Sequence, residues 1–183
     1  MLKAIAIVAI LIAVGLSAVL VLASTKPDTV RVERSLAVNA PASAIYPLIA
    51  DFHRWTAWSP YEQRDPAMKR TFGGAAQGKG ATYAWDGNGN VGAGKMEILE
   101  ANPSSAIRIK LDFERPFEAH NVAEFTFVTQ GGATLVTWAM QCPTPLLSKV
   151  MQVFIDMDRM IGKDFEAGLA SLKRVTEQMP TKG

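Results

Sequence analysis

The chain has 183 residues, with 19 Lys and Arg against 17 Asp and Glu and a formal net charge of +2. A charge this balanced argues against nucleic acids and acidic polymers as partners. The single cysteine, Cys142, excludes an intramolecular disulfide and a cysteine-rich metal site.

The first feature along the chain is an uncharged, apolar run at residues 4–23. A helix of about 20 residues is about 30 Å long, which matches the hydrocarbon core of a bilayer. Residues 1–25 are therefore predicted to form an N-terminal transmembrane anchor or uncleaved signal, followed by a linker at residues 26–29. Attachment to a membrane through residues 4–23 is the expected localisation.

Two aspects of this segment stay open. Val21-Leu22-Ala23 resembles the small-residue site of a cleaved signal peptide, although the apolar run exceeds the usual length of about 7–15 residues. Lys3 precedes the run and Lys26 and Arg31 follow it, so the distribution of positive charge does not decide which side of the membrane the domain occupies.

A strand and two short helical segments follow the linker. Residues 30–38 alternate between apolar and polar side chains, which predicts a half-buried first strand. Asn39-Ala40-Pro41 ends it and begins a short helix over residues 42–50. Asp51 is placed to cap a further helical turn over residues 52–58, which Ser59-Pro60 would end.

The middle of the chain alternates like an antiparallel sheet. In the clearest segment, Ile107, Ile109, Leu111 and Phe113 alternate with charged residues, so that one face is dry and the other wet. Further strands are predicted with hairpin signals such as Asp86-Gly87-Asn88-Gly89 between them. The expected segments are residues 68–72, 81–86, 91–100, 107–114, 118–128 and 134–141.

The last long segment, Pro145 to Gln178, carries apolar residues at steps of three and four, typical of one face of a helix. A single helix of about 30 residues would be about 45 Å long and would need a broad partner surface. We therefore predict an α+β fold in which a curved antiparallel sheet of about six to seven strands surrounds this long C-terminal helix. The domain is expected to cover residues 30–178, with a tail at residues 179–183.

Several motifs, in this order, resemble the START-like (SRPBCC) superfamily in its polyketide cyclase/dehydrase branch. They include Ala40-Pro41-Ala42, Trp55-x-x-Trp58-Ser59-Pro60, Gly92-x-Gly94-x-Met96, Thr137-Trp138-x-Met140 and Gly162-x-Asp164-Phe165. The resemblance covers about residues 30 to 177. It implies the helix-grip fold, with a deep apolar pocket between the sheet and the C-terminal helix. It implies no single activity, because the superfamily contains lipid carriers, hormone and polyketide binders, aromatase/cyclases and co-chaperone-like modules.

Motifs for other chemistry have little support. Gly87-x-Gly89-x-x-Gly92 matches the dinucleotide fingerprint in letters, but its glycines lie in a predicted hairpin and no helix follows to hold a pyrophosphate. His53 and His120 are the only histidines, and neither has partners at metal-ligand spacing. The serines lack the context of a hydrolase nucleophile. No metal and no cofactor are predicted.

The carboxylates are expected to be caps or solvated charges. Asp156, Asp158, Asp164 and Glu166 fall on the polar side or flanks of the predicted long helix. Asp51, Glu62 and Asp86 could lie near the rim of a pocket, but nothing in the sequence selects one of them as an acid or base. No catalytic residue is therefore predicted.

Aromatic and methionine side chains are the candidate pocket lining. Ala119, Ala123 and Gly168 would leave room among them, and Asn121 would offer a polar contact, in a site of the mostly apolar kind that binds ligands. The sequence leaves open whether these side chains fill a core or line a pocket. The candidates are Trp55, Trp58, Tyr83, Trp85, Met96, Phe113, Asn121, Phe125, Trp138, Met140, Phe154, Met157 and Ile161.

The expected function is to bind or transfer a hydrophobic small molecule or lipid. An enzyme of the cyclase or dehydratase type is one alternative and would need convergent polar groups inside the cavity. A protein-interaction module with a filled cavity is another and would expose an apolar patch. The oligomeric state and the identity of the ligand stay open.

Overall fold

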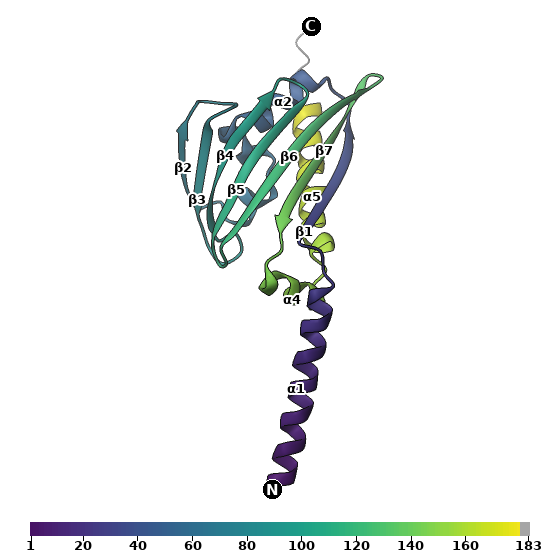
Figure 1. The fold of residues 1–183 in the computed structure, drawn as a ribbon. Coiled ribbons are helices and arrows are strands. Elements are labelled where there is room, and N and C mark those ends of the chain that lie inside the picture. Colours follow the sequence, from purple (N-terminus) through teal and green to yellow (C-terminus); the bar gives the residue numbers. More distant parts are fainter. Residues whose placement is uncertain (180–183) are drawn as a thin grey trace.

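A computed structural model describes residues 1–179. The predicted tail at residues 179–183 therefore lies, except for Met179, outside the described residues. Seven strands form a single antiparallel sheet that curves around a C-terminal helix (Figure 1). The strands are β1 (Thr29–Val38), β2 (Lys69–Gly74), β3 (Ala81–Asp86), β4 (Ala93–Asn102), β5 (Ala106–Arg115), β6 (Ala119–Gln130) and β7 (Ala133–Pro143).

The sheet order is β1-β7-β6-β5-β4-β3-β2, a meander in which the first strand pairs with the last. The alternating pattern explains the meander, because each strand buries one face and turns back through a short connection. In the β1–β7 pair, Thr29 lies opposite Pro143. The start of β1 and the end of β7 therefore lie side by side, which brings the N-terminal and C-terminal helices together.

Three short helices connect β1 to β2: α2 (Ala42–Ala50), η1 (Phe52–Ala57) and α3 (Pro60–Arg64). The predicted cap is confirmed, because the Asp51 side chain accepts a hydrogen bond from the His53 backbone N–H at 2.9 Å. The turn ends before Ser59-Pro60, as predicted, and the same two residues also begin α3, since proline at the first helical position needs no N–H partner.

The predicted single helix from Pro145 to Gln178 is wrong: the segment forms α4 (Leu146–Phe154) and α5 (Met157–Glu177). Ile155 is extended, and the Asp156 side chain caps α5 by accepting from the Arg159 N–H at 2.9 Å. Only α5 packs across the sheet, and it buries Phe165, Leu169 and Leu172. The break lets α4 leave the direction of α5.

The apolar N-terminal segment forms α1 (Leu2–Ser24), which projects away from the sheet (Figure 1). Among the described residues it is the one helix that is long and apolar enough to cross a membrane, by length and composition. Its last turn meets α4, and Ala23 there is completely buried.

Candidate ligand-binding cavity

A cavity of about 410 Å³ lies between the concave face of the sheet and helix α5. Its volume falls in the range of about 300–1,000 Å³ that is usual for small-molecule sites. The lining comes from β1 and β3 to β7 on one side and from η1, α3, α4 and α5 on the other, and most of it is apolar. The core is thus not completely filled, contrary to the expectation of a filled interaction module.

Most of the predicted lining residues do meet at this cavity. The sheet contributes them because alternate residues of each strand point to its concave face. The predicted residues that line the cavity are Trp55, Tyr83, Trp85, Met96, Phe113, Asn121, Trp138, Met140, Met157 and Ile161. Ala119 and Ala123 also line it, as expected of small residues that leave space.

Three predicted lining residues lie elsewhere. Trp58 and Phe125 are completely buried in the core, with ring centroids 6.0 Å apart. Phe154 was predicted to point inward, but it is 72% exposed because α4 ends there and faces away from the sheet. Gly168 allows close contact between α5 and β7 and does not border the cavity.

A buried ionic cluster forms one polar part of the lining. Glu62 of α3 is 5% exposed and lies 2.7 Å from the guanidinium of Arg70. The Tyr83 hydroxyl donates to the other Glu62 oxygen at 2.7 Å. Burial, together with this hydrogen bond to Glu62, raises the pKa of the Tyr83 hydroxyl, so this side chain stays a neutral donor at ordinary pH.

Asp164 is the second carboxylate at the cavity. It was predicted to be a cap or solvated charge on the polar side or flanks of the helix, but it lines the cavity and pairs with Arg64 of α3. Nearby, burial raises the pKa of the Tyr61 hydroxyl, which also lines the cavity. No local pattern could have indicated the pairing of Asp164 with Arg64, because these two residues lie 100 positions apart in the chain.

Two further polar groups border the apolar space. Asn121 lines the cavity from β6 and is 7% exposed. The Trp138 ring also lines it, and its Nε1–H has no hydrogen-bond partner among residues 1–179. A buried donor without an acceptor costs free energy, so this N–H lowers the stability of the fold at this point.

The remaining lining residues were not singled out by the sequence. Several come from α4 and the start of α5. The prediction of one continuous helix pointed the side chains of these segments in the wrong direction. They include Ser148, Gln152 and Met160 beside the edge residues Val30, Pro116 and Thr144. An Asp at a helix N-cap, with another Asp two residues later, was the available signal for the break at Asp156.

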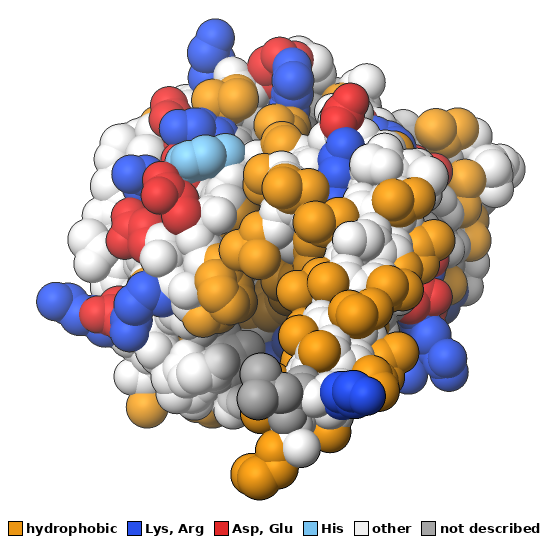
Figure 2. Space-filling model, turned by 60° about the horizontal axis from the view of Figure 1, so that its bottom comes forward, with side chains coloured by type: hydrophobic (Ala, Val, Ile, Leu, Met, Phe, Trp, Pro, Cys, Tyr) orange, Lys and Arg blue, Asp and Glu red, His pale blue; other side chains and the backbone are white. Residues whose placement is uncertain are grey.

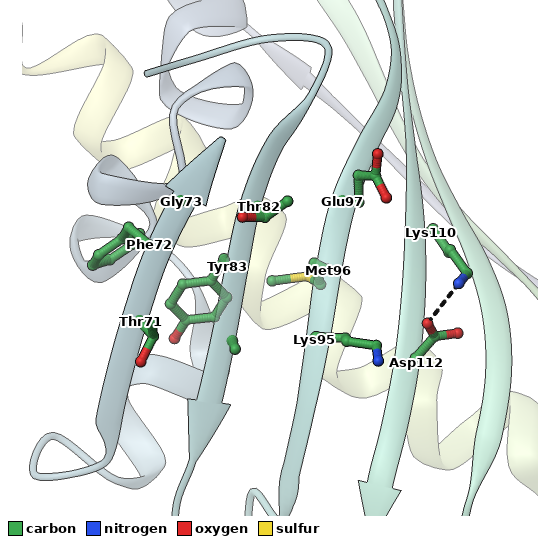
Figure 3. Close-up of a pocket in the computed structure, with 11 residues that line it drawn as sticks. Thr71, Phe72, Gly73, Thr82, Tyr83, Lys95, Met96, Glu97, Lys110 and Asp112 are labelled. Carbon is green, nitrogen blue, oxygen red and sulfur yellow. Dashed lines mark ion pairs between the residues drawn. The ribbon is translucent and has the colours of Figure 1, made fainter. Parts of the chain in front are cut away.

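A second depression, of about 330 Å³, lies on the sheet across β2 to β5 (Figure 3). Charged side chains border it, among them Lys95, Glu97 and Lys110. Lys110 pairs with Asp112 at 2.8 Å, the contact marked in Figure 3. This charged border does not suit an apolar ligand, and the cavity under α5 is the better candidate.

The glycines and histidines that sequence analysis did not assign to a site make contacts within the fold. Gly87 to Gly92 join the antiparallel strands β3 and β4, which confirms the predicted hairpin. His53 stacks on Phe72 with ring centroids 4.1 Å apart, and His120 contacts Asp112. Within residues 1–179, no three His, Cys, Asp or Glu side chains are grouped so that they could hold a metal ion.

A curved antiparallel sheet that holds a C-terminal helix over an apolar cavity defines the helix-grip class of protein. Residues 29–177 match the family model described as polyketide cyclase / dehydrase and lipid transport. The chain therefore belongs to this family, which confirms the family indicated by its motifs. No curated protein matches the sequence.

Solved structures share the fold at low identity. The di-domain aromatase/cyclase StfQ from the steffimycin biosynthetic pathway superposes with a TM-score of 0.61 and 12% identity, over 82% of this chain and 52% of StfQ. A Thermobifida fusca protein gives a TM-score of 0.60 and 20% identity, over 82% and 95% of the two chains. The Aha1 dimer from Colwellia psychrerythraea gives 0.58 and 16%, over 84% and 99%. At these identities the likeness shows the fold alone.

Proposed function

We propose that this chain is a membrane-anchored protein that binds a hydrophobic small molecule or lipid in the cavity under α5. The cavity carries the proposal, because it has about 410 Å³ of space and a mostly apolar lining with a few polar groups. Each ligand methylene moved from water into such a site contributes about 0.8 kcal/mol. Affinity for an apolar molecule needs no further chemistry.

The family description, which names lipid transport beside polyketide cyclisation, supports this class of ligand. The amide of Asn121, which lines the cavity, favours a ligand that carries a polar group on an apolar body. The membrane part of the proposal rests on α1, whose exposed apolar side chains would be costly to keep in water. A cleaved signal peptide is the alternative for this helix.

The test uses the full chain in phosphatidylcholine nanodiscs, with dansyl-labelled undecanoic acid as the probe. Trp55, Trp85 and Trp138 line the cavity, so a bound dansyl group should receive energy from them. Saturable transfer above that of empty nanodiscs is the expected result. Transfer that rises in proportion to the probe without saturation would contradict the proposal.

A matched pair of variants separates the cavity from nonspecific uptake. Ala119→Phe reduces the space at a lining position, and losing room for about two methylenes should weaken probe binding about tenfold. Ala37→Phe makes the same change on an exposed position of β1 and should bind like the parent chain. Equal binding by both variants would remove the cavity as the site.

A cyclase or dehydratase reaction is the second candidate function. The observation that favours it is the approach of Glu62, Tyr83 and Asp164 to the same cavity, since such a reaction needs convergent polar groups. Tyr83→Phe keeps the ring and removes the hydroxyl. If the reaction occurs in this cavity, the parent chain incubated with a poly-β-ketone should yield a product that has lost water. Tyr83→Phe should form no such product but should still bind the dansyl probe.

A further inference from the structure

Helix α4 exposes several large apolar residues, while Val150, Met151 and Val153 are half-buried. None of its residues is buried, and Leu146, Leu147 and Phe154 are 61%, 62% and 72% exposed. Ile155 and Met160 extend this exposed apolar surface into the start of α5. A soluble domain would normally turn such a face to its core, so another partner is indicated.

The position of α4 is fixed against the end of α1. Ala23, in the last turn of α1, is completely buried where the two helices meet. The connection is held by the Thr144 N–H, which donates to the Asp28 carbonyl at 2.9 Å, and by an ion pair between Lys149 and Asp28. The exposed apolar face of α4 therefore stays beside the point where α1 enters the domain.

A loop from the sheet lies at the same end. Phe117, between β5 and β6, is 62% exposed, and its neighbour Pro116 lines the cavity. Figure 2 looks toward the end of the molecule from which α1 projects and shows hydrophobic side chains gathered there. We call Phe117, Leu146, Leu147, Phe154, Ile155 and Met160 the apolar rim.

The apolar rim also borders the entrance of the cavity. Ser148 and Gln152 of α4, Met160 of α5 and Pro116 of the β5–β6 connection all belong to the lining. The cavity therefore reaches the surface at the end of the domain that carries α1. If α1 spans a bilayer, its length of about 34 Å puts its last turn, and with it the apolar rim, at the membrane interface.

We propose that the apolar rim inserts into the lipid leaflet next to the end of α1 and holds the cavity entrance against that leaflet. The cavity then exchanges its ligand directly with the bilayer, and the ligand is an apolar molecule of that leaflet. This inference rests on the membrane anchoring proposed above. The apolar face of α4 is the second attachment, because an amphipathic helix lies in the interface with its apolar side in the acyl boundary.

The test places an environment-sensitive label at three positions of the full chain in phosphatidylcholine vesicles. Phe154→Cys reports on the apolar rim, Val8→Cys on α1, and Val128→Cys on an exposed apolar residue of β6 away from α4. Each variant is labelled with a nitrobenzoxadiazole fluorophore. Vesicles with and without doxyl-labelled lipids then show which labels contact acyl chains. Cys142 is buried, and its pKa is raised to about 11, so the native thiol reacts slowly.

Quenching at residues 8 and 154 together, with none at residue 128, is the expected result. Quenching at residue 8 alone would overturn the docking of the rim and leave the anchor in place. No quenching at residue 8 would overturn the anchor and this inference with it. Equal quenching at residues 128 and 154 would also overturn the inference, because contact would then not be specific to the rim.

A transfer measurement adds a readout for function. Leu147→Glu puts a charge into the rim without touching the cavity lining, and Val128→Glu is its matched control. The rate at which the dansyl fatty acid moves from vesicles to the protein should fall about tenfold in Leu147→Glu only. Equal rates in the two variants would contradict direct exchange with the leaflet.

Discussion

Gly168 of α5 lies directly against the indole of Trp138 in β7: a Cβ at this glycine would be 2.6 Å from Cζ3 of that ring. The ring cannot move aside easily, because it stacks on Phe165 with centroids 4.2 Å apart. Pro60 of α3 borders the same space at 3.1 Å. The absence of a side chain at residue 168 therefore sets how closely the helix approaches the sheet.

Gly168→Leu should destabilise the fold by about 1–3 kcal/mol, because overpacking a close contact forces rings and backbone apart. Thermal unfolding of the full chain measures it as a lower melting temperature. Ala170→Leu, at an exposed position of the same helix, is the control and should change little. An unchanged melting temperature in Gly168→Leu would show that the contact is looser than the structure indicates.

Arg70→Met should cost about 3–5 kcal/mol, because it leaves the buried Glu62 carboxylate without its ion-pair partner. Arg108→Met removes a guanidinium whose contact with Glu100, at 3.4 Å, is exposed, and should cost less than about 1 kcal/mol. Urea unfolding of both variants gives the comparison. Similar losses of unfolding free energy in the two variants would mean that the buried Glu62–Arg70 pair contributes no more to stability than the exposed Glu100–Arg108 pair.

The pH dependence of stability should include a contribution from Asp112, which is 5% exposed. Burial raises the pKa of this carboxyl, but hydrogen bonds from Lys110 and His120 outweigh burial, and the net pKa lies below the usual range. A carboxyl with a lowered folded-state pKa stabilises the fold above its unfolded pKa of about 3.9 and loses this effect as the pH falls.

The difference in unfolding free energy between the parent chain and Asp112→Asn should therefore be at its full size at about pH 5 and above, and should shrink toward about pH 2. Urea unfolding at several pH values measures this difference, with other titrating groups common to both proteins. A difference that stays constant over this range would contradict the lowered pKa of Asp112 in the folded chain.

Cys142 should react slowly with thiol reagents. Burial raises its pKa to about 11, so the reactive thiolate fraction at about pH 8 should be more than about 100-fold below that of a free cysteine. The rate of reaction with a disulfide reagent, compared with the rate in denaturant, measures the effect. Reaction at the unfolded rate would show that the thiol is open to solvent.

Much of the fold could be predicted because local pattern and tertiary position agree along the strands. In β5, Ile107 and Ile109 are completely buried, as their alternation with charged residues indicated. The same agreement placed Met96, Trp138 and Met140 on the concave face, where they line the cavity. A period of two specifies which face is buried, whatever the neighbouring strand is.

The site was harder to predict where it depends on contacts between distant segments. The apolar spacing runs through residues 146–175 without a gap, so periodicity alone joined α4 and α5 and placed Phe154 in the pocket. Asp164 was assigned to solvent because its partner Arg64 belongs to another helix. Periodicity reports which face of one element is apolar and carries no information about what that face meets.

By itself, the sequence determined the strands of the antiparallel meander and the length of the N-terminal apolar helix, because both follow from the local spacing of side chains. Its motifs indicated the family by resemblance. Only the tertiary structure decided what α4 packs against, namely the end of α1, and that β1 pairs with β7. These features depend on contacts between segments more than 100 residues apart, such as Asp28 with Lys149 and Thr29 opposite Pro143. Local side-chain spacing carries no information about contacts at this separation.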